Sequence, residues 1–345
     1  TASNNTAVGY HALQVNTTGT QNTAVGALAL DAHTVGQDCT AIGYNALGAN
    51  TAASHNTAVG SFTLSSTTTG DNNTAVGRAS LNSNTSSNNT GVGYNSLVLN
   101  TTGHSNTAIG ANALDTNTTG YQQVAVGESA LSANTTGARN HAVGQQALEL
   151  NTTGSNNVAF GYSALENLTT ANNNTGIGHK ALEACTTGES NTAVGAFAGS
   201  SLGTGVNNII IGKDAQASAS NQSNQIILGN SSNDDLRCND QVIGALSDAR
   251  DKTDVVDLPV GLSFIDSIRP VKFKWASRDG NGHDGKIRAG FLAQELQTAS
   301  TDATYLNLVQ NENPEKLTAK YGNLIPVMVQ AIKELSAKVT ALEAG

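Results

Sequence analysis

The sequence predicts a mostly β protein. A trimeric β-solenoid (β-roll) of 17-residue coils precedes a small α+β domain that ends in a coiled-coil helix. Two observations lead to this prediction. A short motif recurs at a nearly constant spacing through the first two thirds of the chain, and the composition changes near residue 246. We therefore interpret residues 1–232 as a repetitive shaft, 233–246 as a linker and 247–345 as a separate domain, with its terminal helix at about 324–343.

The repeat is anchored by a glycine that closes the motif Asn-Thr-Ala-Val-Gly. Self-similarity at a fixed period is the signature of a repeat architecture. Successive anchors lie 17 residues apart, except for one spacing of 16 between Gly77 and Gly93. The anchors are Gly9, Gly26, Gly43, Gly60, Gly77, Gly93, Gly110, Gly127, Gly144, Gly161, Gly178, Gly195, Gly212 and Gly229.

Each copy carries two apolar segments and a polar turn. The Ala-Val-Gly stretch suits a stacked strand, and the Ala-Leu pair, as in Ala113 and Leu114, supplies a second apolar edge. The Asn-Thr-Thr-Gly segment, as in 151–154, favours a turn because Asn and Gly tolerate positive φ. We expect one coil per copy, made of two short strands and two turns. Coils stacked about 4.8 Å apart would form a rod of about 65–70 Å.

A single rod of this kind has a thin core, since each coil contributes about one Val and one Leu. Such a small cross-section gives marginal stability. Three rods packed together could bury the Ala-Leu edges between chains. This reasoning predicts a homotrimer.

Charge and hydropathy exclude several classes of partner. The chain before Ser247 has a net charge of −8, and the remainder has −1. Phosphate binding needs clustered cations, so nucleic acid is not expected. No run of 18 apolar residues occurs, so we expect no membrane insertion. The chain begins at Thr1 without a signal peptide, and we expect that an upstream segment is missing.

Ligand-binding functions of the repeat are less well supported than a passive structural rod. Its threonines flank Asn and Gly turns, so we do not expect a flat Thr-x-Thr face that could bind ice. The regularly spaced Asp residues of calcium-binding repeats are missing, and we expect no metal and no cofactor. The histidines occupy different positions of the repeat, which argues against a metal ladder: His11, His33, His55, His104, His141 and His179.

The three cysteines are expected to be reduced and packed. Cys39 and Cys185 would lie about eight coils apart, roughly 38 Å, which is far beyond disulfide reach. Cys238 follows the repeats. We therefore expect no redox role.

The repeats resemble the head and shaft coils of trimeric adhesins and phage tail fibres. Those families also carry Asn-x-Ala-(Val/Ile)-Gly coils, usually of a somewhat different length. The resemblance covers residues 1 to about 232 and implies a trimeric β-roll.

The C-terminal block carries a different set of motifs. A Ser-Asp-x-Arg-x-Lys pattern occupies 247–252, and further motifs follow at 262–265, 268–275, 290–295 and 321–326. In this order they resemble the endosialidase-type intramolecular chaperone, the self-cleaving C-terminal domain of phage tailspikes and fibres. The same domain occurs in a membrane-bound myelin transcription factor.

The residues of this block support a trimer-forming end. Alternating apolar and cationic residues at 271–275 indicate a half-buried strand, and Pro326 suits the beginning of a helix. Apolar residues then follow at spacings of 4, 3, 4 and 3, which predicts a short coiled coil. The alternative is one amphipathic helix on a globular core. This apolar seam consists of Met328, Ile332, Leu335, Val339 and Leu342.

The resemblance also implies a cleavage site between Leu246 and Ser247. It implies Ser247 as the nucleophile and Lys252 as the base, in a single-turnover serine endopeptidase that cuts its own chain. Asp248 and Arg250 match the same motif, and we assign them a structural ion pair.

The sequence is compatible with three functions. The favoured one is a viral tail fibre or tailspike shaft that attaches to a host receptor or glycan. Its C-terminal domain would trimerise the chains in the host cytoplasm and then cut itself off. The second is a bacterial trimeric adhesin with a non-cleaving cap at the extracellular surface; a soluble coiled-coil end argues against it. The third is an endosialidase-like hydrolase, whose catalytic domain would precede Thr1.

Overall fold

The computed structural model describes residues 2–233, 249–274, 285–310 and 317–345. The chain divides into two compact units, Thr1–Asn230 and Ser231–Gly345. The predicted mostly β fold is confirmed, with a parallel β-solenoid, a small C-terminal α/β region and a terminal helix. The predicted linker at 233–246 lies almost entirely outside the described residues, so the proposed domain bounds remain a prediction.

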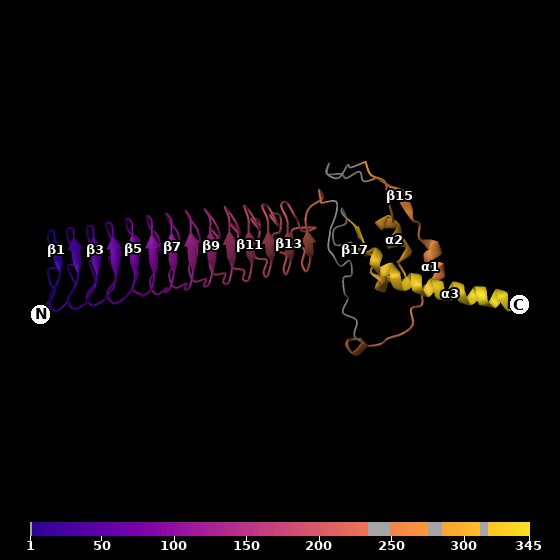
Figure 1. The fold of residues 1–345 in the computed structure, drawn as a ribbon, viewed down its shortest axis with the longest axis horizontal. Helices are drawn as coiled ribbons and strands as arrows, with labels where there is room; N and C mark the ends of the chain where they lie inside the picture. The colour runs from indigo at the N-terminus through magenta and orange to yellow at the C-terminus, as the bar shows by residue number, and fades with distance from the viewer. Residues whose placement is uncertain (1, 234–248, 275–284, 311–316) are drawn as a thin grey trace. The chain divides into compact units, whose positions relative to one another are not determined.

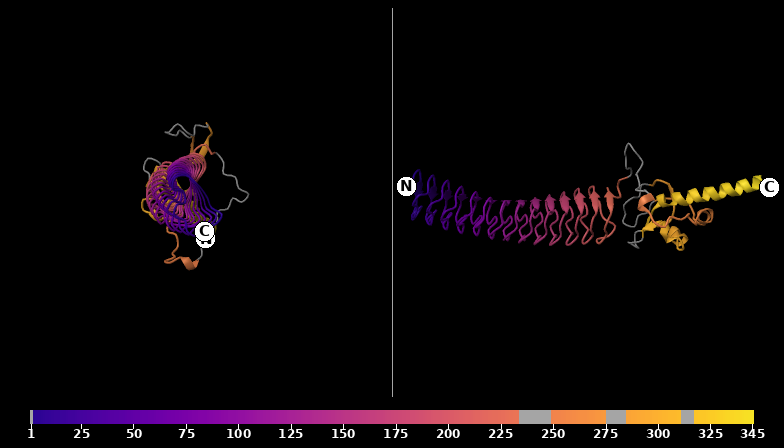
Figure 2. Two further views of the ribbon diagram at one scale, coloured as in Figure 1. Left: turned by 90° about the vertical axis from the view of Figure 1, so that its left-hand side faces the viewer. Right: turned by 90° about the horizontal axis from the view of Figure 1, so that it is seen from below.

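The first unit is a stack of coils whose strands form one 14-stranded parallel sheet in chain order (Figure 1). Equivalent repeat positions pair directly, as Thr107 does with Val124. An end-on view shows the coils following one another along a single axis (Figure 2). The strands are β1 (Thr6–Val8), β2 (Thr23–Val25), β3 (Thr40–Ile42), β4 (Thr57–Val59), β5 (Thr74–Val76), β6 (Thr90–Val92), β7 (Thr107–Ile109), β8 (Val124–Val126), β9 (His141–Val143), β10 (Val158–Phe160), β11 (Thr175–Ile177), β12 (Thr192–Val194), β13 (Ile209–Ile211) and β14 (Ile226–Leu228).

Side chains alternate along each short strand, as the pleat requires. In β7, Ala108 is fully buried, whereas Ile109 is 41 % exposed. Thr107 lies on the same outward side and is half-buried. Strands β2 to β12 therefore bury a small central residue, Ala or Gly, and present their two larger residues outward.

The structure of the Ala-Leu region differs from the prediction in two respects. Each coil has one strand rather than two, because the Ala-Leu region is built from turns in which Ser129 and Leu131 have φ values of 56° and 54°. Such left-handed residues cannot continue an extended strand. Ala130 and Leu131 are also fully buried inside their own coil. The expectation that Ala-Leu edges are buried between chains is therefore wrong.

The anchor glycines are fixed by stacking. Gly127 has a φ of +134°, which side chains rarely adopt, and a Cβ there would lie 2.5 Å from the carbonyl oxygen of Gly144 in the next coil. The same two conditions recur at most of the other anchors. Only glycine permits this close approach of backbones, which explains why the anchor recurs so regularly.

Buried asparagines stabilise the coils by hydrogen bonds rather than by positive φ. The side chain of Asn106 donates to the Gly120 carbonyl at 2.9 Å, and its backbone N–H donates to Asn89 Oδ1 at 3.0 Å. In the Asn-Thr-Thr-Gly turn, Asn117 Nδ2 also donates to the Gly120 carbonyl, at 3.0 Å, and to Asn100 Oδ1 at 2.7 Å. Two internal amide ladders therefore satisfy polar groups that water cannot reach.

The second unit is small and built around one apolar cluster. Phe264, Leu306, Leu308, Leu324 and Val327 are buried together in it. The strand pairs β15–β16 and β17–β18 are antiparallel. Its elements are η1 (Ala249–Asp251), α1 (Leu262–Ser267), β15 (Val271–Phe273), β16 (Arg288–Gly290), α2 (Ala293–Ala299), η2 (Thr304–Leu306), β17 (Val309–Gln310), β18 (Thr318–Ala319), η3 (Tyr321–Leu324) and α3 (Ile325–Glu343).

Candidate functional site

The predicted cleavage residues are only partly within the described chain. Leu246, Ser247 and Asp248 lie outside the described residues. Lys252 directly follows η1, and its backbone N–H donates to the Ala249 carbonyl at 3.2 Å. Its side chain is exposed in this single chain. The pairing of Ser247 with Lys252 therefore remains a prediction, as does the ion pair of Asp248 with Arg250.

The chain that follows Lys252 is tied to the terminal helix at α1. Glu334 of α3 accepts a hydrogen bond from the Leu262 backbone N–H at 2.9 Å, and this bond lowers the pKa of the Glu334 carboxyl. A Cβ at Gly261 would lie 2.3 Å from Glu334 Oε1, so a larger residue there would require the Glu334 side chain to shift. The contact was not predicted from the sequence, because Leu262 and Glu334 are 72 residues apart and Glu334 belongs to none of the motifs.

The terminal helix α3 has two apolar faces with different environments. Val327 and Ala331 are buried. The predicted seam is instead exposed, from 44 % at Met328 to 81 % at Leu342. An amphipathic helix that served only this core would leave no such second face. The seam is therefore free, within this chain, to pack against another helix.

An apolar groove adjoins the beginning of the seam. It has a volume of about 560 Å³, and Met328 lines it together with Ile265, Phe291 and Tyr321. The Tyr321 hydroxyl spans the Phe291 backbone, accepting from its N–H and donating to its carbonyl, both at 3.1 Å. This arrangement holds the loop between β16 and α2 against the segment that leads into α3.

The comparison with family models finds one matching segment, which lies within the second unit. Residues 247–305 match the Peptidase_S74 family, described as chaperone of endosialidase. The matched segment begins at Ser247, includes Lys252 and ends within η2. No curated protein and no solved structure matches the chain.

The chaperone-of-endosialidase match supports the resemblance that the motifs indicated. The family implies autoproteolytic, peptidase-like activity and is associated with trimerisation. Its combination with a β-solenoid suggests a tail-fibre-like protein. None of the helices in the described parts of the chain has the length and apolar character needed to cross a bilayer.

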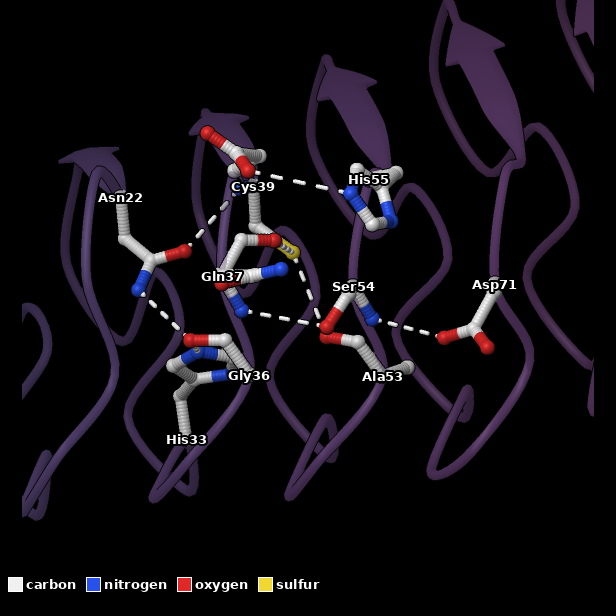
Figure 3. Close-up of polar contacts among 10 residues, drawn as sticks. Asn22, His33, Gly36, Gln37, Cys39, Ala53, Ser54, His55 and Asp71 are labelled. Atoms are coloured by element: carbon white, nitrogen blue, oxygen red, sulfur yellow. Dashed lines mark hydrogen bonds and ion pairs between the residues drawn. The ribbon is translucent and has the colours of Figure 1, made fainter.

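The shaft holds polar contacts whose arrangement is structural. In Figure 3, Asn22 Nδ2 donates to the Gly36 carbonyl at 3.0 Å, and His33 Nε2 contacts the same oxygen at 2.9 Å. The Cys39 thiol contacts the Ala53 carbonyl at 3.3 Å, and burial raises its pKa to about 11. At neutral pH the Cys39 thiol therefore stays protonated, and a protonated thiol is a poor nucleophile.

The other cysteines and the metal-ligating residue types give no further site within the described residues. Cys185 is buried, and burial also raises its pKa to about 11; Cys238 lies outside the described residues. In the part of the chain that the structure describes, no group of three or more His, Cys, Asp or Glu residues could hold a metal ion.

Proposed function

We propose that this chain is part of a viral tail fibre or tailspike whose C-terminal unit assembles three copies and then cuts the chain between Leu246 and Ser247. The observation that carries the proposal is the family match, which begins at Ser247 and follows a β-solenoid shaft. The exposed seam of α3 supports assembly through a helix of another copy. The shaft would serve in the virion for host attachment, with a surface receptor or glycan as its further partner.

The chemistry follows from the position of Ser247 directly after the scissile bond. Its Oγ attacks the Leu246 carbonyl carbon while Lys252 takes the hydroxyl proton. The C–N bond then breaks, the Ser247 nitrogen takes up a proton, and Leu246 is left as an ester on Oγ. Water hydrolyses that ester. The products are a Leu246 carboxylate and a free Ser247 amino group, from a single turnover.

Assembly offers a reason for the reaction to follow folding. A lysine acts as a base only in its neutral form, which desolvation favours. Lys252 is exposed in the single chain, so burial against a second copy would supply the desolvation. Cleavage would then remove the template needed to rebuild the shaft, and the cut trimer would be kinetically locked.

Three variants test the proposed dyad in the full chain. We expect the wild type to separate into pieces of residues 1–246 and 247–345 on a denaturing gel and by intact mass. Ser247→Ala and Lys252→Ala should stay whole. The control Lys272→Ala should be cleaved normally, because this exposed lysine of β15 is not part of the proposed dyad. Cleavage of Ser247→Ala at the same bond, or a wild type that stays whole as a folded trimer, would disprove the mechanism.

A further inference from the structure

The shaft presents a continuous face that its own coils do not cover. The first and third residues of every strand from β1 to β14 point outward, and we call these two rows the strand face. The third residue is Val, Ile, Phe or Leu in every strand, as in Ile42 and Phe160. Many of these side chains are more than a third exposed, and Ile226 in the first row is 72 % exposed. An uncovered apolar row of this length marks an interaction surface.

We propose that the strand face is where the shafts of three copies of this chain pack against one another. The proposal rests on the trimer of the proposed function and identifies the surface that holds it together along the shaft. It replaces the Ala-Leu edge, which is buried inside each coil.

Substitutions within the first row favour a protein partner over an ordered-water or ice surface. Thr is commonest there, and an ice-binding face would need the hydroxyl ladder to continue. The chain instead keeps apolar character in most of the strands that lack Thr. The replacements are Val124, His141, Val158, Ile209 and Ile226.

Charge also selects another copy of the shaft. None of the strands β1 to β14 contains Asp, Glu, Lys or Arg. The acids recur elsewhere in the coil, and one position carries Asp31, Asp115, Glu149, Glu166 and Glu183. Packing through the uncharged strand face lets acidic shafts associate without burying like charges.

Geometry and flanking residues agree with this occupant. A partner can contact every strand of the row in the same way only if its own repeat has the same rise per coil. A second copy of the shaft has that rise because its sequence is identical. Next to the strand face, after the anchor glycine, lie Tyr44, Tyr94 and Tyr162, with Arg78 stacked over Tyr94. Tyrosine and arginine are enriched at protein interfaces.

The strand face is most apolar at the end nearest the C-terminal unit in sequence. There β13 is Ile-Ile-Ile and β14 is Ile-Ile-Leu. If three copies are first joined through α3, the coils nearest to α3 in sequence would pack together first. Those coils carry the most apolar strands and so gain the most free energy from burying them. The order of apolar character thus matches assembly that proceeds from the C-terminal end.

Cysteine cross-linking in the full chain tests the proposal. A Cys238→Ser, Ser247→Ala background removes a native thiol and keeps α3 attached. Single cysteines are then placed at Ile109 on the strand face, at Thr102 in the exposed turn as a control, and at Leu335 in the α3 seam. A bis-maleimide of about 10 Å spans the usual gap between packed sheets.

We expect Ile109→Cys and Leu335→Cys to give a two-chain band on a denaturing gel, and Thr102→Cys to give none. In the assembled chain, Ile109→Cys should also react at least tenfold more slowly with a bulky soluble maleimide than Thr102→Cys. If only Leu335→Cys cross-links, the strand face is open to another occupant, such as a host surface, and this inference is wrong. If neither cross-links and the mass is that of one chain, the proposed trimer itself fails.

Discussion

At the residue scale, the shaft depends on positions where no side chain fits. Gly127 combines a positive φ with a backbone carbonyl 2.5 Å from the position of a Cβ, and neither constraint can relax without moving the next coil. The sequence predicts the anchor through its regular recurrence. It does not reveal the reason, because the clash involves a glycine 17 residues later.

A glycine pair measures this constraint. Gly127→Ala should lower the free energy of unfolding of the shaft by about 1–3 kcal/mol from backbone strain alone. Gly203→Ala is the matched control, because its Cβ would be 3.6 Å from the nearest atom and its φ is not positive. The control should be neutral or slightly stabilising. Equal losses in thermal or denaturant unfolding would contradict this explanation.

His33 occupies a turn position that most coils give to asparagine. It is fully buried, its Nδ1 has no hydrogen-bond partner, and burial lowers its pKa. A histidine whose folded-state pKa is depressed resists protonation, whereas the unfolded chain binds the proton near its ordinary pKa of about 6.5. His33 therefore does not lower the free energy of unfolding above about pH 6.5. As the pH falls below that value, protonation favours the unfolded chain and the free energy of unfolding declines.

His33→Asn should remove that acid sensitivity. The amide can also accept from the Gly36 N–H, as Asn16 does from Gly19 at 3.0 Å, and one such bond adds about 0.5–1.5 kcal/mol. Unfolding measured at pH 7.5 and pH 5 should show a smaller difference for this variant than for the wild type. His104→Asn, at an exposed position, should retain the wild-type difference. An unchanged profile for His33→Asn would contradict the assignment.

At the element scale, the repeat period predicts a parallel stack, but the content of each coil was predicted only in part. A leucine with positive φ is disfavoured by about 1–2 kcal/mol. Leu131 adopts this conformation because full burial in the stack offsets the cost. Local sequence rules therefore suggest a second strand where the structure has turns. The outward position of the Thr and Val rows was not predicted either. The sequence does not show which side chains of such a short strand face the interior of the coil.

The terminal helix was predicted from its spacing, and its apolar seam is exposed in the single chain. Leu335→Glu should prevent assembly and therefore cleavage, because a charge at a core position of a coiled coil is strongly unfavourable. Ala337→Glu adds the same charge at an exposed position off the seam and should leave both intact. Native mass spectrometry would report the assembly of both variants, and a denaturing gel would report their cleavage. A cleaved, trimeric Leu335→Glu would contradict the role of α3.

At the scale of the whole molecule, the chain combines two structural units of different kinds, a repetitive shaft and a small C-terminal unit. The shaft repeats one coil, so each rung contacts only its neighbours and stability accumulates along the stack. The C-terminal unit supplies an exposed helical seam and a segment that matches the chaperone-of-endosialidase family. The motifs predicted this family match. The pairing of Ser247 with Lys252 remains a prediction, because Ser247 lies outside the described residues.

The most direct test of the central claim, that three copies assemble and then cut themselves, is the mass of the wild-type protein measured twice. Native mass spectrometry should give three copies of the shaft. Denaturing mass spectrometry of the same sample should give residues 1–246 and 247–345 as separate chains. A native mass of one chain, or a folded trimer whose denatured chains all retain residues 1–345, would contradict the account.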